Sequence, residues 1–165
     1  MAKLIFLRGN SGSGKSTVAK SLREQSKSGR KIAIVEQDYL RRLVLKEKER
    51  DNGDNIGLIR QTVEYALAND YDVILEGILY GPRYGLMIKS LIKKADQHWL
   101  YYFDVSFKET LKRHNTKHNA HEFGEKEMRE WYNENDRLGF ENEITIPESH
   151  NLDDAVKQIL SETKL

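Results

Sequence analysis

Five short apolar segments alternate along the chain with segments whose apolar residues recur every three or four positions. The first pattern is typical of strands and the second of helices. Four of the five short segments are almost entirely apolar, as expected of strands that are buried on both faces of a sheet. The predicted strands are residues 3–8, 31–36, 72–77, 99–105 and 143–146. Strands that alternate with helices predict an α/β fold in which a parallel sheet carries helices on both faces.

The segments between these strands predict seven helices. They are residues 15–25, a helix that begins at Tyr39, residues 56–68, 84–94, 107–114 and 125–138, and a last helix that begins at Asn151 or Asp153. Ser106 and Glu109 are spaced as a capping box before the fifth of them. The helix predicted at 84–94 contains the apolar residues Leu86, Ile88, Leu91 and Ile92, and the last helix has a predicted buried face formed by Leu152, Val156, Ile159 and Leu160.

Residues 47–55 are charged and contain the turn signal Asp51-Asn52-Gly53-Asp54. This composition favours a solvated loop. A flap that moves over a substrate is the alternative.

The most informative stretch of the sequence is 9–17, which reads GNSGSGKST and matches the pattern G-x-x-x-x-G-K-[ST] without a departure. It lies between the first predicted strand and the first predicted helix, which is the context that this phosphate-binding motif requires. Glycines let the backbone approach a ligand closely. Successive N–H groups and the positive end of the following helix then form a site for anionic oxygens.

Within this motif, Lys15 is expected to reach the β- and γ-phosphates of a nucleotide, and the Ser16 hydroxyl to bind Mg²⁺. A chance glycine turn and a dinucleotide-binding turn are the alternatives. The spacing is not G-x-G-x-x-G, and a lysine followed by a serine has no role in that second motif. The candidate nucleotide-binding residues are Gly9, Asn10, Ser11, Gly12, Ser13, Gly14, Lys15, Ser16 and Thr17.

Ligands of open parallel sheets bind beyond the carboxyl ends of the strands, so the acids at these ends are candidates for chemistry. Asp38 follows the second predicted strand and could accept a proton from an attacking hydroxyl, or could merely cap the next helix. Glu76 ends the third strand and could help to hold Mg²⁺ or contact substrate, or could be an exposed strand-end acid. Gly77 would permit a close approach to this edge.

Several cations follow the predicted strands and helices. Arg113 and Lys117 share one helical face and could close over a triphosphate, although cations are also favoured at any helix C-terminus. Arg41, Arg42 and Arg83 could contact substrate or form structural ion pairs with nearby acids. A metal site formed by His114, His118 and His121 is disfavoured, because no H-E-x-x-H arrangement is present.

Composition narrows the possibilities further. The chain has 165 residues, no cysteine and a net charge of +1. Disulfides and thiolate metal sites are therefore excluded, and the weak charge argues against a dedicated nucleic-acid binder. We expect a single domain at 1–165, no membrane segment, and residence in the cytoplasm. The sequence predicts no oligomeric state.

Four segments together, LIFLRGNSGSGKST, VEQDYLRR, VILEG and KETLKRHNTKH, resemble those of the small P-loop kinases. The similar branch contains chloramphenicol phosphotransferase, gluconate and shikimate kinases, zeta-type toxins and the kinase part of polynucleotide kinases. The resemblance implies a P-loop NTPase fold in three layers, with a five-stranded sheet in the order 2-3-1-4-5. It also implies ATP, Mg²⁺ and transfer of the γ-phosphoryl group to a hydroxyl.

By the same resemblance, Asp38 matches the base after the second strand, Lys15 the phosphate lysine and Arg113 the first cation of a lid at about 113–137. Lys117 stands where the second lid cation is often arginine, and this difference removes bidentate geometry. The adenine would lie near Arg113 and residues 147–151. A small-molecule kinase is thus the predicted function.

Two alternatives remain. One is a kinase for a nucleoside, a nucleotide or a polynucleotide 5′ end. The other is a nucleotide-dependent binding switch, for which the segments N-K-x-D and D-x-x-G are missing.

Overall fold

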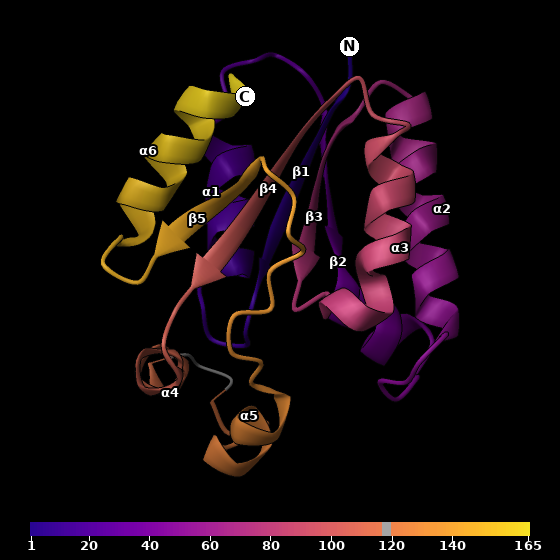
Figure 1. The fold of residues 1–165 in the computed structure, drawn as a ribbon. Helices are drawn as coiled ribbons and strands as arrows, with labels where there is room; N and C mark the ends of the chain where they lie inside the picture. Colours follow the sequence, from indigo (N-terminus) through magenta and orange to yellow (C-terminus); the bar gives the residue numbers. More distant parts are fainter. Residues whose placement is uncertain (117–119) are drawn as a thin grey trace.

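The chain folds around a five-stranded parallel sheet (Figure 1). The structure, a computed structural model, describes residues 1–116 and 120–165. The strands are β1 (Lys3–Gly9), β2 (Ile32–Glu36), β3 (Asp72–Gly77), β4 (Gln97–Asp104) and β5 (Glu143–Pro147). Their order in the sheet is β2-β3-β1-β4-β5, which confirms the predicted fold class and strand order.

Helices cover both faces of this sheet. The described α-helices are α1 (Lys15–Gln25), α2 (Asp54–Ala68), α3 (Gly81–Ile92), α4 (Phe107–Asn115), α5 (Glu125–Trp131) and α6 (Leu152–Thr163), and a six-residue π-helix, η1 (Tyr39–Val44), follows β2. Figure 1 shows α1 and α6 on one face and α2 and α3 on the other, with α4 and α5 beyond the carboxyl ends of the strands. Among the described residues, none of the helices combines the length and the apolarity needed to cross a membrane.

Successive side chains of a strand point to opposite faces of the sheet, and each face has its own apolar core. Leu4 and Phe6 of β1 face one core with residues of α2 and α3, whereas Ile5 and Leu7 face the other with residues of α1 and α6. All four side chains are fully buried. An apolar run on β1 is therefore required by burial on both faces of the sheet, as its sequence predicted.

The predicted buried face of α6 was only partly right. Val156 and Ile159 are buried, but Leu152 is 41% exposed, so the prediction that Leu152 is buried was wrong. In α3, Ile88 and Leu91 are buried and Leu86 is 84% exposed. Helix α3 begins three residues earlier than predicted, because Pro82 lies in its first turn, where a missing N–H costs nothing. Asn151 caps α6 and accepts a hydrogen bond from the Asp154 N–H.

The predicted helix over 125–138 was also too long, since α5 ends at Trp131. Tyr132 takes an extended conformation. The backbone N–H of Asn133 then donates to Asn10 Oδ1 over 2.8 Å. Tertiary contacts with the motif at 9–17 therefore replace the helical hydrogen bonds that the local sequence would allow.

Residues 47–53 form a largely exposed loop, as predicted, whereas 54 and 55 already belong to α2. Two acids of the loop hold it against α2 and α3. The Glu47 carboxylate accepts hydrogen bonds from the backbone N–H groups of Asp54 and Asn55 and from the Asn55 side chain, and it thereby satisfies the first turn of α2. These bonds, above all the one from the Asn55 side chain, lower the pKa of Glu47 to about 2. Glu49 accepts a hydrogen bond of 2.8 Å from the buried Tyr84 hydroxyl.

An arginine that the sequence analysis left without a role is buried at the end of β1. Arg8 has no exposed surface, and its guanidinium pairs with Asp136 at 2.8 Å and with Glu143 at 3.1 Å. Arg8 also donates to the backbone carbonyl of Leu79, while Asp136 accepts from the Gly81 N–H. We call Arg8, Asp136 and Glu143 the Arg8 cluster. Because Arg8 directly precedes Gly9, this cluster connects the start of the glycine-rich motif to α3, β5 and the segment after α5.

Removing one member of a buried ion cluster leaves the other charges without compensation, which is costly. We therefore expect Arg8→Met to lower the free energy of unfolding by about 3–5 kcal/mol. Urea unfolding would measure this. Arg129→Met is the matched control, because the Arg129–Glu125 pair lies on an exposed face of α5 and should cost less than about 1 kcal/mol. Equal losses in the two variants would contradict a structural role of the Arg8 cluster.

Candidate active site

The motif at 9–17 forms the turn between β1 and α1. Three of its glycines have positive φ angles, namely Gly9 at 146°, Gly12 at 80° and Gly14 at 99°. Gly14 occupies the N-cap of α1, and the Gly14 carbonyl accepts a hydrogen bond from the Val18 N–H. The N-terminus of α1 therefore points into a loop of backbone N–H groups, which is an arrangement suited to an anion.

The glycine at position 12 is required by a close approach as well as by its φ angle. A Cβ atom at Gly12 would lie 2.6 Å from the backbone oxygen of Thr110 in α4. Helix α4 thus packs directly on the loop, and any side chain at position 12 would force one of them to move.

We expect Gly12→Ala to weaken binding of the ATP analogue AMP-PNP by at least about tenfold, because strain and the displaced loop act on the same N–H groups. Isothermal titration calorimetry would measure this. The matched control is Gly29→Ala, since Gly29 also has a positive φ of 71° but no heavy atom lies within 4 Å of its Cβ position. Gly29→Ala should leave the affinity unchanged, and an equal loss there would argue against the packing explanation.

Lys15 and Ser16 connect the loop to the neighbouring strand. The Lys15 side chain is buried, and its Nζ donates to the Asn10 carbonyl at 2.8 Å and to Ser13 Oγ at 3.2 Å. Ser16 Oγ donates to Glu76 Oε1 at 2.7 Å. Glu76 is only 5% exposed, and burial raises the pKa of its carboxyl, an effect that Lys15 and Ser16 oppose.

The Ser16–Glu76 pair is suited to a hard cation. Mg²⁺ is usually bound by one or two carboxylates together with substrate phosphates and water rather than by a dedicated cage. A buried carboxylate next to a hydroxyl and a phosphate loop matches that pattern. Among the described residues, no group of three or more His, Cys, Asp or Glu side chains could hold a metal ion.

Asn10 has a contact that the motif pattern does not reveal. Its side-chain amide donates to the Asn133 carbonyl and accepts from the Asn133 N–H, both at 2.8 Å. The side-chain amide of Asn10 is therefore already hydrogen-bonded, and only the backbone N–H of Asn10 remains a candidate for binding a nucleotide. The segment after α5 is therefore held at two positions, by Arg8 directly before the motif and by Asn10 within it.

Three cavities surround the loop, and each is defined here by one of its residues. The Lys15 cavity, of about 340 Å³, is lined by the loop and by Glu36, Asp38, Arg42, Glu76 and Phe123. The Tyr84 cavity, of about 470 Å³, continues from it, and Ser11, Asp38, Arg42, Ile78 and Phe123 line both. The Arg113 cavity, of about 460 Å³, lies on the other side of the loop, between α4 and residues 146–152.

Asp38 therefore lies at the junction of two cavities. Its side chain is 58% exposed and accepts a 2.9 Å hydrogen bond from Arg41 Nη2. It makes no capping hydrogen bond to η1. The alternative that Asp38 merely caps the next helix was therefore wrong.

Arg113 reaches from α4 to the loop. Its guanidinium donates to the Ser13 carbonyl at 3.2 Å and to the Glu148 carbonyl at 2.9 Å, and it pairs with Glu109 at 3.0 Å.

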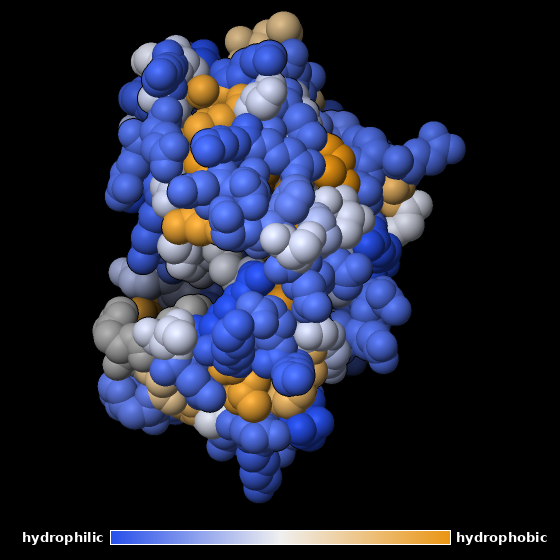
Figure 2. All heavy atoms as spheres, turned by 90° about the vertical axis from the view of Figure 1, so that its left-hand side faces the viewer, coloured by the Kyte–Doolittle hydropathy of each residue, from blue (hydrophilic) through white to orange (hydrophobic). Residues whose placement is uncertain are grey.

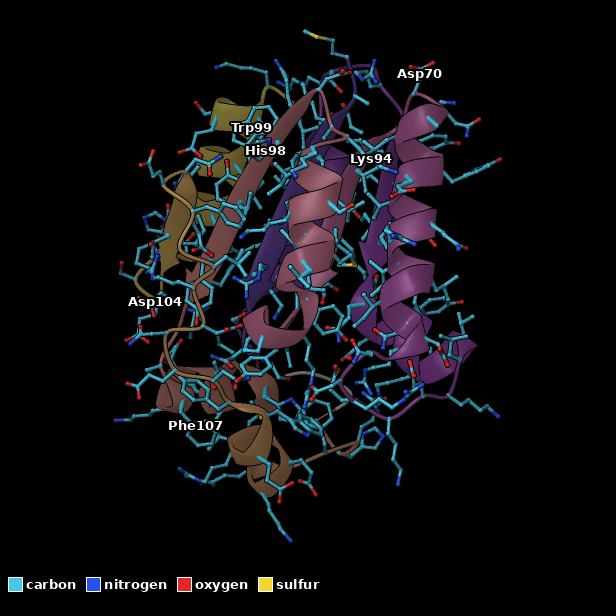
Figure 3. The ribbon with its side chains drawn as sticks, turned by 45° about the vertical axis from the view of Figure 1, so that its right-hand side comes forward. Asp70, Lys94, His98, Trp99, Asp104 and Phe107 are labelled. Atoms are coloured by element: carbon cyan, nitrogen blue, oxygen red, sulfur yellow. The ribbon has the colours of Figure 1, made fainter. Side chains whose placement is uncertain are left out.

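Figure 3 shows Phe107, the first residue of α4, near Asp104 at the carboxyl end of β4, whereas His98 and Trp99 lie toward the opposite end. Figure 2, which views the molecule from the side of α6, shows it hollowed between its upper and lower parts.

Other predicted site residues have structural partners. Arg41 lies 3.1 Å from Glu49 in addition to Asp38, and Arg83 pairs with Asp51 at 2.7 Å, so the ion-pair alternative applies to both. The His114 ring stacks on Phe123, and its Nε2 lies 2.9 Å from the Phe123 carbonyl. Lys117 and His118 lie outside the described residues.

The strand order, the glycine loop with its lysine and serine, and the acid at the end of β3 define a P-loop nucleotide-binding domain. A family profile described as an AAA domain, AAA_33, matches residues 4–132. The match covers most of the chain, including β1, the loop and α1, and the chain belongs to this family. No curated protein sequence matches the chain significantly.

Solved structures share the fold at low sequence identity. The APS kinase of Mycobacterium tuberculosis, solved with AMPPNP and APS, is 14% identical with a TM-score of 0.78, and the match covers 99% of this chain and 98% of that chain. A gluconokinase from Sinorhizobium meliloti is 18% identical, with a TM-score of 0.68 over 96% and 90% of the two chains. A sugar kinase from Janibacter is 12% identical, with a TM-score of 0.65 over 99% and 95%. The chain thus has the fold of small P-loop kinases.

Proposed function

We propose that this protein is an ATP-dependent kinase that transfers the γ-phosphoryl group to a hydroxyl of a small molecule. The observation that carries the proposal is the junction of the two cavities at Asp38. One cavity contains the phosphate loop with Lys15 and Ser16, and the other is large enough for a small acceptor. The solved structures that share this fold include a gluconokinase and an APS kinase, which supports a small acceptor.

The proposed reaction is an in-line displacement. The acceptor oxygen forms a bond to the γ-phosphorus while the bond from that phosphorus to the β–γ bridging oxygen breaks, and ADP leaves with the electron pair. Asp38 orients the acceptor hydroxyl and accepts its proton. Lys15 leaves its contacts with Asn10 and Ser13 and neutralises charge on the β- and γ-phosphates.

Other residues would hold the nucleotide. The backbone N–H groups from Gly9 to Thr17 would bind the phosphates, and Arg113 would close over them from α4, with Lys117 as a second lid cation. Ser16 and Glu76 would hold Mg²⁺, which supplies neutralisation of the β- and γ-phosphate charge. The adenine ring of ATP would lie in the Arg113 cavity, beside residues 147–151. Arg41 and Arg83 would shape the acceptor side through their ion pairs.

The test measures the transfer of labelled phosphate from [γ-³²P]ATP to a panel of small hydroxyl compounds by the 165-residue chain in the presence of Mg²⁺. A labelled organic product supports the proposal. Tight ATP-analogue binding with release of inorganic phosphate alone, for every acceptor, would favour a nucleotide-dependent switch instead. As part of the same proposal, the chain acts as one kinase domain over 1–165 and works in the cytoplasm, where ATP is abundant.

A further inference from the structure

The Tyr84 cavity carries a pattern of charge that narrows the class of acceptor. It is lined by four cations, Arg41, Arg42, Lys48 and Arg83, and by three acids, Asp38, Glu49 and Glu130. A charged side chain that already has ion-pair or hydrogen-bond partners is less available to bind a ligand, so the contacts of each one are compared in turn. The inference below rests on the proposed kinase function.

Glu49 already accepts two hydrogen bonds and forms an ion pair. Its oxygens accept from the Tyr84 hydroxyl at 2.8 Å and from Gln37 Nε2 at 3.1 Å, and they lie 3.1 Å from Arg41 Nε. Tyr84 and Gln37 are buried, so these bonds cannot be exchanged cheaply for bonds to a ligand. Glu49 therefore serves as a structural acid that fixes Arg41 and is not a site for a cationic acceptor.

The remaining arginines divide into two groups. Arg41 is held by Asp38 and Glu49, and Arg83 by Asp51. In contrast, within residues 1–116 and 120–165 neither Arg42 nor Lys48 forms an ion pair or a side-chain hydrogen bond. Two uncompensated cations thus line a cavity beside Asp38, and Glu130 at its α5 side is the single lining acid without such a partner among these residues.

Aromatic side chains form another part of the wall of this cavity. Phe123 and Trp131 pack with ring centroids 5.0 Å apart, and the Arg83 guanidinium lies 5.7 Å from the Tyr80 ring centroid. Such a wall fits the C–H faces of a compact carbon skeleton. A cationic acceptor would meet Arg42 and Lys48 as like charges, whereas an anionic group would gain charge-assisted hydrogen bonds from both.

We propose that the acceptor is a hydroxylated small molecule that carries a carboxylate or phosphate group, and that Arg42 and Lys48 bind this anionic group. Asp38, which lines both cavities, then faces the acceptor hydroxyl. Arg42 also lines both the Lys15 and Tyr84 cavities, whereas Lys48 lines the Tyr84 cavity alone. Lys48 recognises the distal part of the acceptor alone.

The experiment compares anionic compounds with neutral compounds of the same carbon skeleton. The protein is first saturated with AMP-PNP and Mg²⁺, so that an anion cannot bind at the phosphate loop instead. Calorimetry then measures the binding of D-gluconate against D-sorbitol and of glycerol 3-phosphate against glycerol. At least one anionic compound is expected to bind at least about tenfold more tightly than its neutral partner, and the pair concerned distinguishes carboxylate from phosphate.

The double variant Arg42→Gln/Lys48→Gln should abolish this preference, and each single variant should reduce it. The matched control is Lys20→Gln/Arg60→Gln, which removes the same charges from exposed positions on α1 and α2 and should retain the preference. AMP-PNP affinity is measured in each variant, because Arg42 also lines the Lys15 cavity.

Equal binding of anionic and neutral compounds, or a preference that survives the double variant, would overturn the inference. The two levels of the proposal fail differently. If AMP-PNP does not bind the unmodified protein, the kinase function itself is wrong. If AMP-PNP binds and neutral compounds bind as well as the anionic ones, only the acceptor class is wrong.

Discussion

Asp38→Asn is expected to lower the rate of phosphoryl transfer by about 10²–10⁴-fold, the usual contribution of a general base. Asparagine keeps the size of the side chain but cannot accept the hydroxyl proton. Asp38 does not belong to the phosphate loop, so AMP-PNP affinity should change by less than about threefold. Single-turnover transfer and calorimetry on the same preparation would measure the two quantities.

Asp54→Asn is the control for this variant. Both acids are exposed and each pairs with an arginine nearby in the sequence, Asp38 with Arg41 and Asp54 with Arg50. The two variants therefore lose the same kind of ion pair, whereas only Asp38 lines the junction of the cavities. Undiminished transfer by Asp38→Asn would show that Asp38 is not the general base. The proposal that the glycine loop binds ATP would not be affected by that result.

Lys15→Ala is expected to reduce transfer by at least about 10³-fold and to weaken AMP-PNP binding by at least about tenfold. The lysine is the buried cation of the loop, and its charge stabilises both the bound triphosphate and the transition state. Unlike Asp38→Asn, this variant should therefore lose affinity and rate together.

Two measurements guard this interpretation. Lys15 contacts Asn10 and Ser13 from a buried position, so urea unfolding should accompany the kinetics to exclude a collapsed loop. Lys20→Ala, on an exposed face of α1, should change neither quantity. Turnover by a folded Lys15→Ala protein at an unreduced rate would show that the loop does not bind the triphosphate as proposed.

Much of the fold followed from local patterns. The apolar strands, the glycine loop and its helix depend on residues that are neighbours in the sequence, and parallel pairing then places the ends of β1 and β3 side by side. Ser16 and Glu76 lie 60 positions apart, yet their contact could be anticipated because both stand at the same edge of the sheet. The strand order itself followed from the family resemblance.

The contacts that could not be predicted join distant segments without a local signal. Arg8 interrupts an apolar strand, but nothing nearby indicates that its partners are Asp136 and Glu143. The early end of α5 has the same cause, because Asn133 is captured by Asn10 across 123 positions. Similarly, only the geometry shows that Arg41 and Arg83 form ion pairs, whereas Arg42 forms none within the part of the chain that the structure describes.

The double attachment of the segment after α5 has a consequence for protein engineering. Residues 121–143, which contain α5, would be one segment to exchange with that of a related chain. They are fastened through Arg8 and Asn10, which belong to the opposite end of the chain. A chimera that carries the segment of a related chain must also carry the matching residues at positions 8 and 10. Otherwise the buried Arg8 guanidinium would lose its carboxylate partner next to the glycine loop.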